Sequence, residues 1–234
     1  MADQTRRKIA VILLGPPGAG KGTQAKLIAG RCKVPHVSTG EILRENVAQG
    51  TDLGAQAKTI MARGELVPDA LVCDMVAWRL RLPDAERGFI LDGFPRTPAQ
   101  AGWLDAFLEH EFFDNSHTGK GLPVVVQLEV DYNQLLRRLT GRRTCPAGHI
   151  YNLYLQPPRV DEVCDVDGLR LVIRNDDREE VIRERLAAYE QQTKPVVDYY
   201  WGKGRLIAVD GDLDVPEVTA QIEKVIDQHC DGDF

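Results

Sequence analysis

Apolar residues gather into short runs that alternate with stretches of helical spacing. Five runs are typical of strands, and the weakest is the second: Ile9–Leu14, 35–38, 89–91, 124–130 and 205–210. Nearly continuous apolar strands that alternate with helices indicate a parallel sheet with both faces covered. The pattern therefore predicts an α/β fold.

Between and after the strands, eight stretches have helical spacing. They cover Lys21–Cys32, Thr39–Gln49, 54–63, 69–82, 98–109, 132–140, 177–200 and 215–229, with Thr39 and Asp69 as predicted N-caps. Residues 38–68 carry two short helices in place of one crossover helix, and a polar surface loop is predicted over 111–123. Residues 141–176 are rich in Pro, Gly, Tyr and Cys. A segment of that length without a helix is typical of a functional lid.

A glycine-rich turn joins the first strand to the first helix, and residues 15–23 read GPPGAGKGT. Its glycines allow backbone N–H groups to curl around an anion, and the helix N-terminus adds the positive end of a dipole. Lys21 supplies a mobile positive charge for the outer phosphates. The hydroxyl group that usually follows this lysine stands one position later, at Thr23, which disfavours a GTPase switch or a motor ATPase. The turn predicts a phosphate-binding loop.

Bulk composition narrows the classes of function. The 234 residues allow one core domain with insertions. A net charge of −6 argues against a general nucleic-acid binder. No apolar run approaches the roughly 18 residues of a membrane span. The first apolar run ends at Gly15, and its short length is typical of a strand rather than of a signal peptide. The odd number of cysteines, five, then favours a reducing, cytoplasmic location.

A second motif follows the strand at 89–91 and reads DGFPR, from Asp92 to Arg96. A carboxylate at the carboxyl end of a buried strand, beside a phosphate loop, is where phosphoryl-transfer enzymes hold Mg²⁺ directly or through water. Taken alone, the motif also suits an N-cap aspartate in a tight turn. Thr23 and Asp92 are the candidates for Mg²⁺.

Arginines gather around the segment 141–176. They are Arg138, Arg142, Arg143, Arg174 and Arg185. Arginines that converge on one site require a polyanion, since like charges repel. Planar guanidinium groups can meet the equatorial oxygens of a transferring phosphoryl group. The set therefore favours a site that lies between two nucleotides.

These ordered motifs resemble those of the adenylate kinase family, and the resemblance extends from residue 9 to about 226. It implies a P-loop fold with a doubly wound, five-stranded parallel sheet and helices on both faces. An insert at 38–68 would bind the nucleoside monophosphate, and a long lid would occupy 141–176. The core would comprise 1–37, 69–140 and 177–234. The implied reaction is ATP + AMP ⇌ 2 ADP with Mg²⁺, carried out by a monomer.

The resemblance also implies roles for single residues. ATP would contact Gly18, Ala19, Gly20, Lys21, Gly22, Thr23, Arg138 and Arg142. AMP would contact Thr39, Arg44, Leu66, Val67, Gly93, Arg96, Gln100, Arg174 and Arg185, with Thr39 and Gln100 at its adenine. The catalytic set would be Lys21, Arg96, Arg138, Arg142, Arg174 and Arg185. Asp176 and Asp177 would be the hinge pair of the lid.

Family members with a zinc lid carry two cysteines near its start and a second pair of ligands near its end. Here the second half is Cys164-x-x-Asp167, but the first half offers only Cys145, with His149 as the nearest replacement. These four residues would form an acceptable tetrahedral site for structural Zn²⁺. The alternative is a lid held by hydrogen bonds among the same groups, as in zinc-free relatives.

Several alternatives to adenylate kinase stay open. A kinase for another pair, such as GTP:AMP or UMP/CMP, is closest, although the long lid disfavours the UMP/CMP type and Thr39 and Gln100 favour adenine as the acceptor. A P-loop binding protein without transfer activity is disfavoured by the arginine set. A zinc-ribbon nucleic-acid module is disfavoured because 145–167 holds one basic residue, Arg159.

Overall fold

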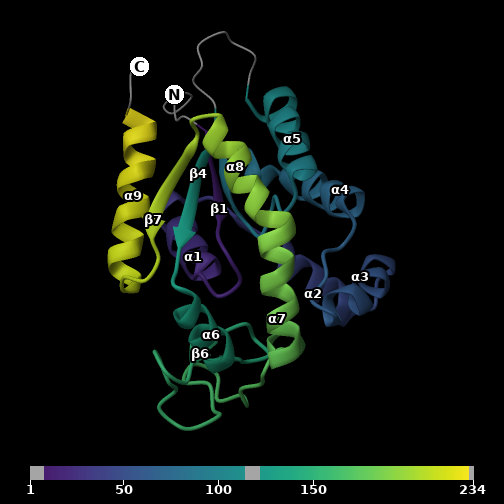
Figure 1. The fold of residues 1–234 in the computed structure, drawn as a ribbon, viewed down its shortest axis with the longest axis vertical. Helices are drawn as coiled ribbons and strands as arrows, with labels where there is room; N and C mark the ends of the chain where they lie inside the picture. Colours follow the sequence, from purple (N-terminus) through teal and green to yellow (C-terminus); the bar gives the residue numbers. More distant parts are fainter. Residues whose placement is uncertain (1–7, 114–121, 232–234) are drawn as a thin grey trace.

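The computed structural model describes residues 8–113 and 122–231, and its main sheet has five parallel strands. The strands are β1 (Ile9–Leu14), β2 (His36–Ser38), β3 (Gly88–Asp92), β4 (Val124–Glu129) and β7 (Leu206–Asp210). Their order is β2-β3-β1-β4-β7, which is a doubly wound arrangement (Figure 1). The predicted parallel sheet is confirmed, including its weakest strand, β2.

Helices cover both faces of this sheet. They are α1 (Lys21–Cys32), α4 (Asp69–Leu80), α5 (Pro98–Phe107), α6 (Tyr132–Gly141), α7 (Glu179–Ala188), α8 (Lys194–Gly202) and α9 (Val215–Asp231). Ala10, Ile12 and Leu14 of β1 pack in one core with α4, α5 and α8. Val11 and Leu13 pack in the other core with α1 and α9. Side chains that alternate along one strand thus divide between two layers of helices.

Two segments extend from the carboxyl ends of the strands (Figure 1). One carries α2 (Thr39–Gln49) and α3 (Asp52–Ala62). The other lies between α6 and α7 and contains a short antiparallel pair, β5 (Arg142–Thr144) with β6 (Ile150–Asn152). Over residues 142–174, all of them described, no helix forms, as the sequence predicts.

Two details of the helices differ from the prediction. The N-caps of α2 and α4 are Ser38 and Pro68, so the predicted caps are one residue late. The helix predicted over 177–200 is interrupted by a π-helical turn at Tyr189–Thr193. Pro195 lies just beyond it and donates no backbone hydrogen bond, which disturbs the regular α-helical ladder.

A second π-helical turn, at Leu108–Phe112, prolongs α5 beyond its predicted end. The polar loop predicted over 111–123 lies mostly outside the described residues. None of the described helices has the length and apolar composition needed to cross a membrane.

Candidate functional site

The glycine-rich turn after β1 has the backbone of a phosphate-binding loop. Gly15, Gly18 and Gly20 have φ angles of 142°, 86° and 94°. A Cβ at Gly15 would lie 2.8 Å from the Leu128 carbonyl oxygen, so this position requires glycine. Gly20 is the N-cap of α1 and no side chain caps it. The first N–H groups of α1 are therefore available to an anion.

Lys21 projects into a pocket beside this loop. Its Nζ donates to the carbonyl oxygens of Gly15 at 2.7 Å and Pro16 at 2.9 Å. Burial lowers the pKa of Lys21 to about 8, against the opposing charge of Asp92. A bound polyphosphate would relieve this unfavourable desolvation of the ammonium group.

Asp92, at the end of β3, faces the first turn of α1. A Cβ at Gly22 would lie 3.2 Å from Asp92 Oδ2, so this carboxylate lies directly against the turn. His36 Nε2 lies 3.4 Å from the same oxygen, on the side of β2. Thr23 follows on this turn of α1 and is exposed. Oxygen groups at this position suit Mg²⁺.

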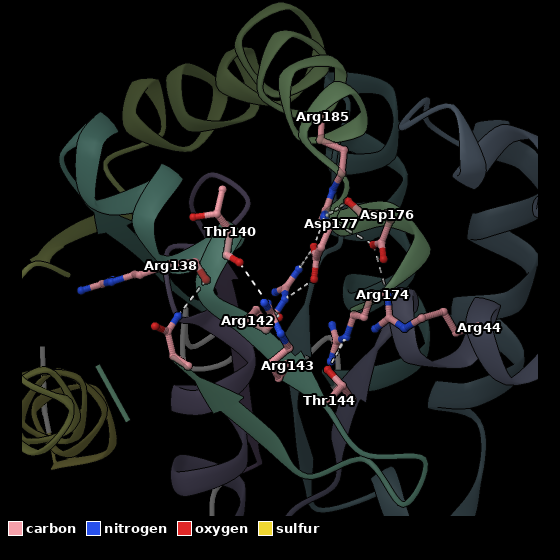
Figure 2. Close-up of polar contacts among 11 residues, drawn as sticks. Arg44, Arg138, Thr140, Arg142, Arg143, Thr144, Arg174, Asp176, Asp177 and Arg185 are labelled. Atoms are coloured by element: carbon pink, nitrogen blue, oxygen red, sulfur yellow. Dashed lines mark hydrogen bonds and ion pairs between the residues drawn. The ribbon is translucent and has the colours of Figure 1, made fainter. Parts of the chain in front are cut away.

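Arginines from three parts of the chain converge on two aspartates (Figure 2). The cluster contains Arg44, Arg142, Arg174, Arg185, Asp176 and Asp177. Arg142 and Asp177 form a bidentate pair. Arg185 Nη1 donates to Asp177 Oδ1 at 2.9 Å and to the Asp176 carbonyl oxygen at 2.8 Å. The Asp176 carboxylate lies 3.4 Å from Arg185 and 3.8 Å from Arg44.

Cations outnumber carboxylates in this region. Burial, with a smaller contribution from the charge of Arg185, lowers the pKa of Arg96 to about 10. Burial, with a smaller contribution from the charge of Arg142, also lowers the pKa of Arg174 to about 10. Although burial alone would raise the pKa of Asp176, Arg185 and Arg44 lower it. Desolvated cations with too few counter-charges favour a bound polyanion.

Two of the predicted arginines lie apart from this cluster. Arg138 points away from the other labelled arginines (Figure 2). Its guanidinium donates to the Gly211 carbonyl oxygen at 2.8 Å and the Ala19 carbonyl oxygen at 3.4 Å. Arg143 donates to the carbonyl oxygens of Thr140 and Arg142. The clamp expected from sequence is therefore not a single group in this structure.

A second pocket adjoins the first, and the two share lining residues at Gly64, Leu66, Gly93, Arg96 and Arg185. The second pocket is also lined by Thr39, Arg44, Val67 and Gln100. Thr39 Oγ1 donates to the Gly93 carbonyl oxygen at 2.8 Å. All of the residues expected at an acceptor nucleotide line this pocket except Arg174.

Several lining or supporting residues are not in the predicted set, and they include Tyr189, Thr193 and Asp69. Tyr189 and Thr193, on the π-helical turn, line the first pocket. Asp69 binds the side chains of Thr97 and Gln100. Pro195 is the local sequence signal for the π-helical turn, and Asp69 has the appearance of an ordinary cap.

A separate group of side chains lies in the segment 142–174. The ligand atoms of Cys145, His149, Cys164 and Asp167 all lie within 4.8 Å of one another. His149 Nδ1 is 3.2 Å from Cys145 Sγ, 3.4 Å from Cys164 Sγ and 3.1 Å from Asp167 Oδ2. One ring nitrogen carries at most one hydrogen, so it cannot donate to all three groups. Atoms bound to one tetrahedral Zn²⁺ would be separated by roughly 3.3–3.8 Å, so the donor set fits this metal.

A phosphate-binding loop lies beside a cationic pocket. This arrangement is typical of an enzyme that binds two phosphorylated ligands side by side, as nucleoside monophosphate kinases do. Comparisons with known proteins agree. A model of the adenylate kinase family matches residues 13–205, so the chain belongs to the adenylate kinase family.

Individual relatives cover nearly the whole chain. An adenylate kinase of Methanocella arvoryzae is 48% identical over 216 residues, which are 92% of this chain and 97% of that protein. One of Archaeoglobus fulgidus is 47% identical, over 93% of this chain and 98% of that protein. One of Acidothermus cellulolyticus is 50% identical, over 90% of this chain and 94% of that protein. The predicted family, fold class and enzyme class are confirmed.

Proposed function

We propose that the chain transfers a phosphoryl group reversibly between ATP and AMP, ATP + AMP ⇌ 2 ADP. The observation that carries this proposal is the pair of adjoining pockets, one on the phosphate-binding loop and one lined by Thr39 and Gln100, with Arg96 and Arg185 in both linings. Groups shared by two pockets can meet a phosphoryl group that passes from one to the other.

In this proposal the donor phosphates lie on the first turn of α1 and on Lys21. Thr23 and Asp92 would hold Mg²⁺ through water, and the ion would supply positive charge to the donor phosphates. Arg138 donates to the Ala19 carbonyl oxygen of the loop, which supports its assignment to the donor phosphates. Domain boundaries at 38–68 for the insert and 141–176 for the lid follow the same assignment.

We assign the acceptor phosphate to Arg44 and Arg96, and the transferring group to Arg138, Arg142, Arg174 and Arg185. No general base is needed, because positioning and charge stabilisation supply most of the rate enhancement in phosphoryl transfer. Closure of the insert and the lid would exclude water, which would otherwise hydrolyse the donor. We further propose a cytoplasmic monomer that binds neither nucleic acid nor membrane.

One assay tests the reaction. The protein is incubated with Mg-ATP and with AMP, GMP, UMP or CMP in turn, and diphosphate formation is followed by chromatography. Transfer to AMP supports the proposal, and a Lys21→Met variant provides the inactive control. Transfer to UMP or CMP but not to AMP would refute the assignment of the acceptor. Replacing ATP with GTP then determines the donor base.

We also propose that Cys145, His149, Cys164 and Asp167 hold a structural Zn²⁺. The apolar core around them is small, consisting of Cys145, Tyr151, Cys164 and Leu171, so a metal would contribute much of the local stability. Metal analysis of the purified protein should give one zinc per chain, and Cys164→Ala should lose it. Cys73→Ala, which removes a buried thiol in α4, is the control and should keep it. Equal zinc content in Cys164→Ala and Cys73→Ala, or no zinc in the unaltered protein, would contradict the proposed site.

A further inference from the structure

A polar network centred on the buried Gln100 side chain adjoins the acceptor pocket, and its role goes beyond packing. Gln100, on α5, is 2% exposed and lines the pocket. Its Nε2 donates to Asp69 Oδ1 at 2.8 Å, and its Oε1 accepts from the backbone N–H of Arg96 at 2.7 Å. The other carboxylate oxygen of Asp69 accepts from Thr97 Oγ1 at 2.7 Å. Asp69 therefore binds α4 to the first turn of α5.

These partners allow the Gln100 amide only one orientation. A carboxylate can only accept hydrogen bonds, so the NH₂ group of the amide must face Asp69. A backbone N–H can only donate, so the amide oxygen must face Arg96. A flipped amide would oppose donor to donor and acceptor to acceptor in a buried site, which carries a large penalty. Both neighbours thus favour the same orientation.

The amide keeps bonding capacity for a ligand. After the two contacts, one N–H of Nε2 and one lone pair of Oε1 are left. Because the amide is held in one orientation, the positions of this donor and this acceptor relative to a bound base are fixed. Adenine offers an exocyclic amine, a donor, beside a ring-nitrogen acceptor, and this order is complementary. Hypoxanthine replaces the amine with a carbonyl oxygen, an acceptor, and so mismatches a fixed amide.

We propose that Asp69 is a specificity-determining positioning residue, which fixes the Gln100 amide so that the acceptor pocket takes a base with an exocyclic amine and rejects one with a carbonyl group there. This inference rests on the proposed function, in which Gln100 meets the acceptor base. Asp69 itself touches no substrate and acts through Gln100. Buried polar groups left unpaired are what make such discrimination strong.

The test compares AMP with IMP, which differ only at this edge of the base, as acceptors for Mg-ATP. Asp69→Asn keeps the side-chain shape but no longer requires a donor to face it, so only the backbone N–H of Arg96 still orients the Gln100 amide. It should lower the ratio of kcat/KM for AMP to that for IMP by about fivefold, and Asp69→Ala by about tenfold or more. The change should appear as a higher KM for AMP, with kcat and the KM for ATP nearly unchanged.

Two controls separate positioning from a structural role. Asp74→Asn makes the same change at an exposed position of the same helix and should leave the ratio unchanged. In a Gln100→Leu background, Asp69→Asn should have no further effect on the ratio, since the two residues act as one unit. Thermal unfolding of each variant reports the structural contribution.

The outcomes are distinct. A ratio within twofold of the unaltered enzyme in both Asp69 variants, with AMP still accepted, would overturn the inference and leave the proposed function standing. An unaltered enzyme that uses AMP and IMP equally well would also overturn it. An unaltered enzyme that transfers to no purine monophosphate would instead contradict the proposed function itself.

Discussion

In the proposed assignment, Asp176 competes with the acceptor phosphate for the same arginines. Its carboxylate lies 3.4 Å from Arg185 and 3.8 Å from Arg44, and both arginines line the acceptor pocket. A phosphate that enters this pocket must share these partners with a fixed negative charge. The carboxylate thus partly neutralises these arginines, which limits the repulsion among them but lowers their affinity for anions.

Removing that charge should therefore strengthen acceptor binding. We expect Asp176→Asn to lower the KM for AMP by about fivefold, on the order of 1 kcal/mol for a partly exposed ion pair. The KM for ATP should change less, because the phosphate-binding loop lies apart from Asp176. Steady-state kinetics with each substrate varied in turn provides the measurement.

Asp198→Asn, which makes the same change at an exposed position of α8, serves as the control. An unchanged or increased KM for AMP in Asp176→Asn would show that the carboxylate orients the arginines more than it competes for them.

Residues were predictable from sequence where a local motif carries the chemistry. Lys21 and Asp92 belong to contiguous motifs, and the structure brings them to one edge of the sheet. Asp69 was not predictable, because its partners lie 28 and 31 positions away and only the packing of α4 on α5 brings them together. Arg138 was expected in the same arginine set, and its contacts with the carbonyl oxygens of Ala19 and Gly211 could not be read from any local motif.

Among the elements, the strands were predicted best, because each is a continuous apolar run flanked by turn residues. The π-helical turn at Tyr189–Thr193 was not predicted, since hydrophobic spacing does not distinguish one extra residue in a helix from an ordinary α-helix. The start of β3 was also placed one residue late, because glycine is a poor indicator of a strand.

Gly88 is important for the stability of the sheet. Gly88 begins β3 with a φ of 142°, and a Cβ there would lie 2.1 Å from the Ile9 carbonyl oxygen of β1. Gly88→Ala should therefore destabilise the protein by roughly 3 kcal/mol or more, through backbone strain and a clash in the central pair of strands. Chemical denaturation followed by circular dichroism measures the change.

Gly102→Ala is the matched control. This glycine lies inside α5, where a Cβ would meet no atom within 4 Å. Alanine should stabilise the helix by about 0.5–1 kcal/mol. Equal effects of the two substitutions would contradict the account of Gly88.

At the scale of the whole molecule, the proposed lid is attached to the core by contacts at the end of α6. Asn152 Nδ2 donates to the Arg138 carbonyl oxygen at 2.9 Å, and the Leu153 N–H donates to the Gly141 carbonyl oxygen at 2.9 Å. If closure of the lid and the insert assembles the site, their opening must precede product release. We predict that this opening limits turnover.

Rapid mixing with Mg-ATP and AMP should then give a burst of ADP comparable to the enzyme concentration, followed by a slower steady rate. A Cβ at Gly141 would lie 2.6 Å from Asn152 Oδ1, so Gly141→Ala should loosen the attachment of the lid. We expect kcat to rise about twofold, as opening becomes easier, while the rate of the burst stays the same. Gly202→Ala, where a Cβ meets no atom within 4 Å, should change neither rate. The absence of a burst would show that phosphoryl transfer, and not opening, is the slow step.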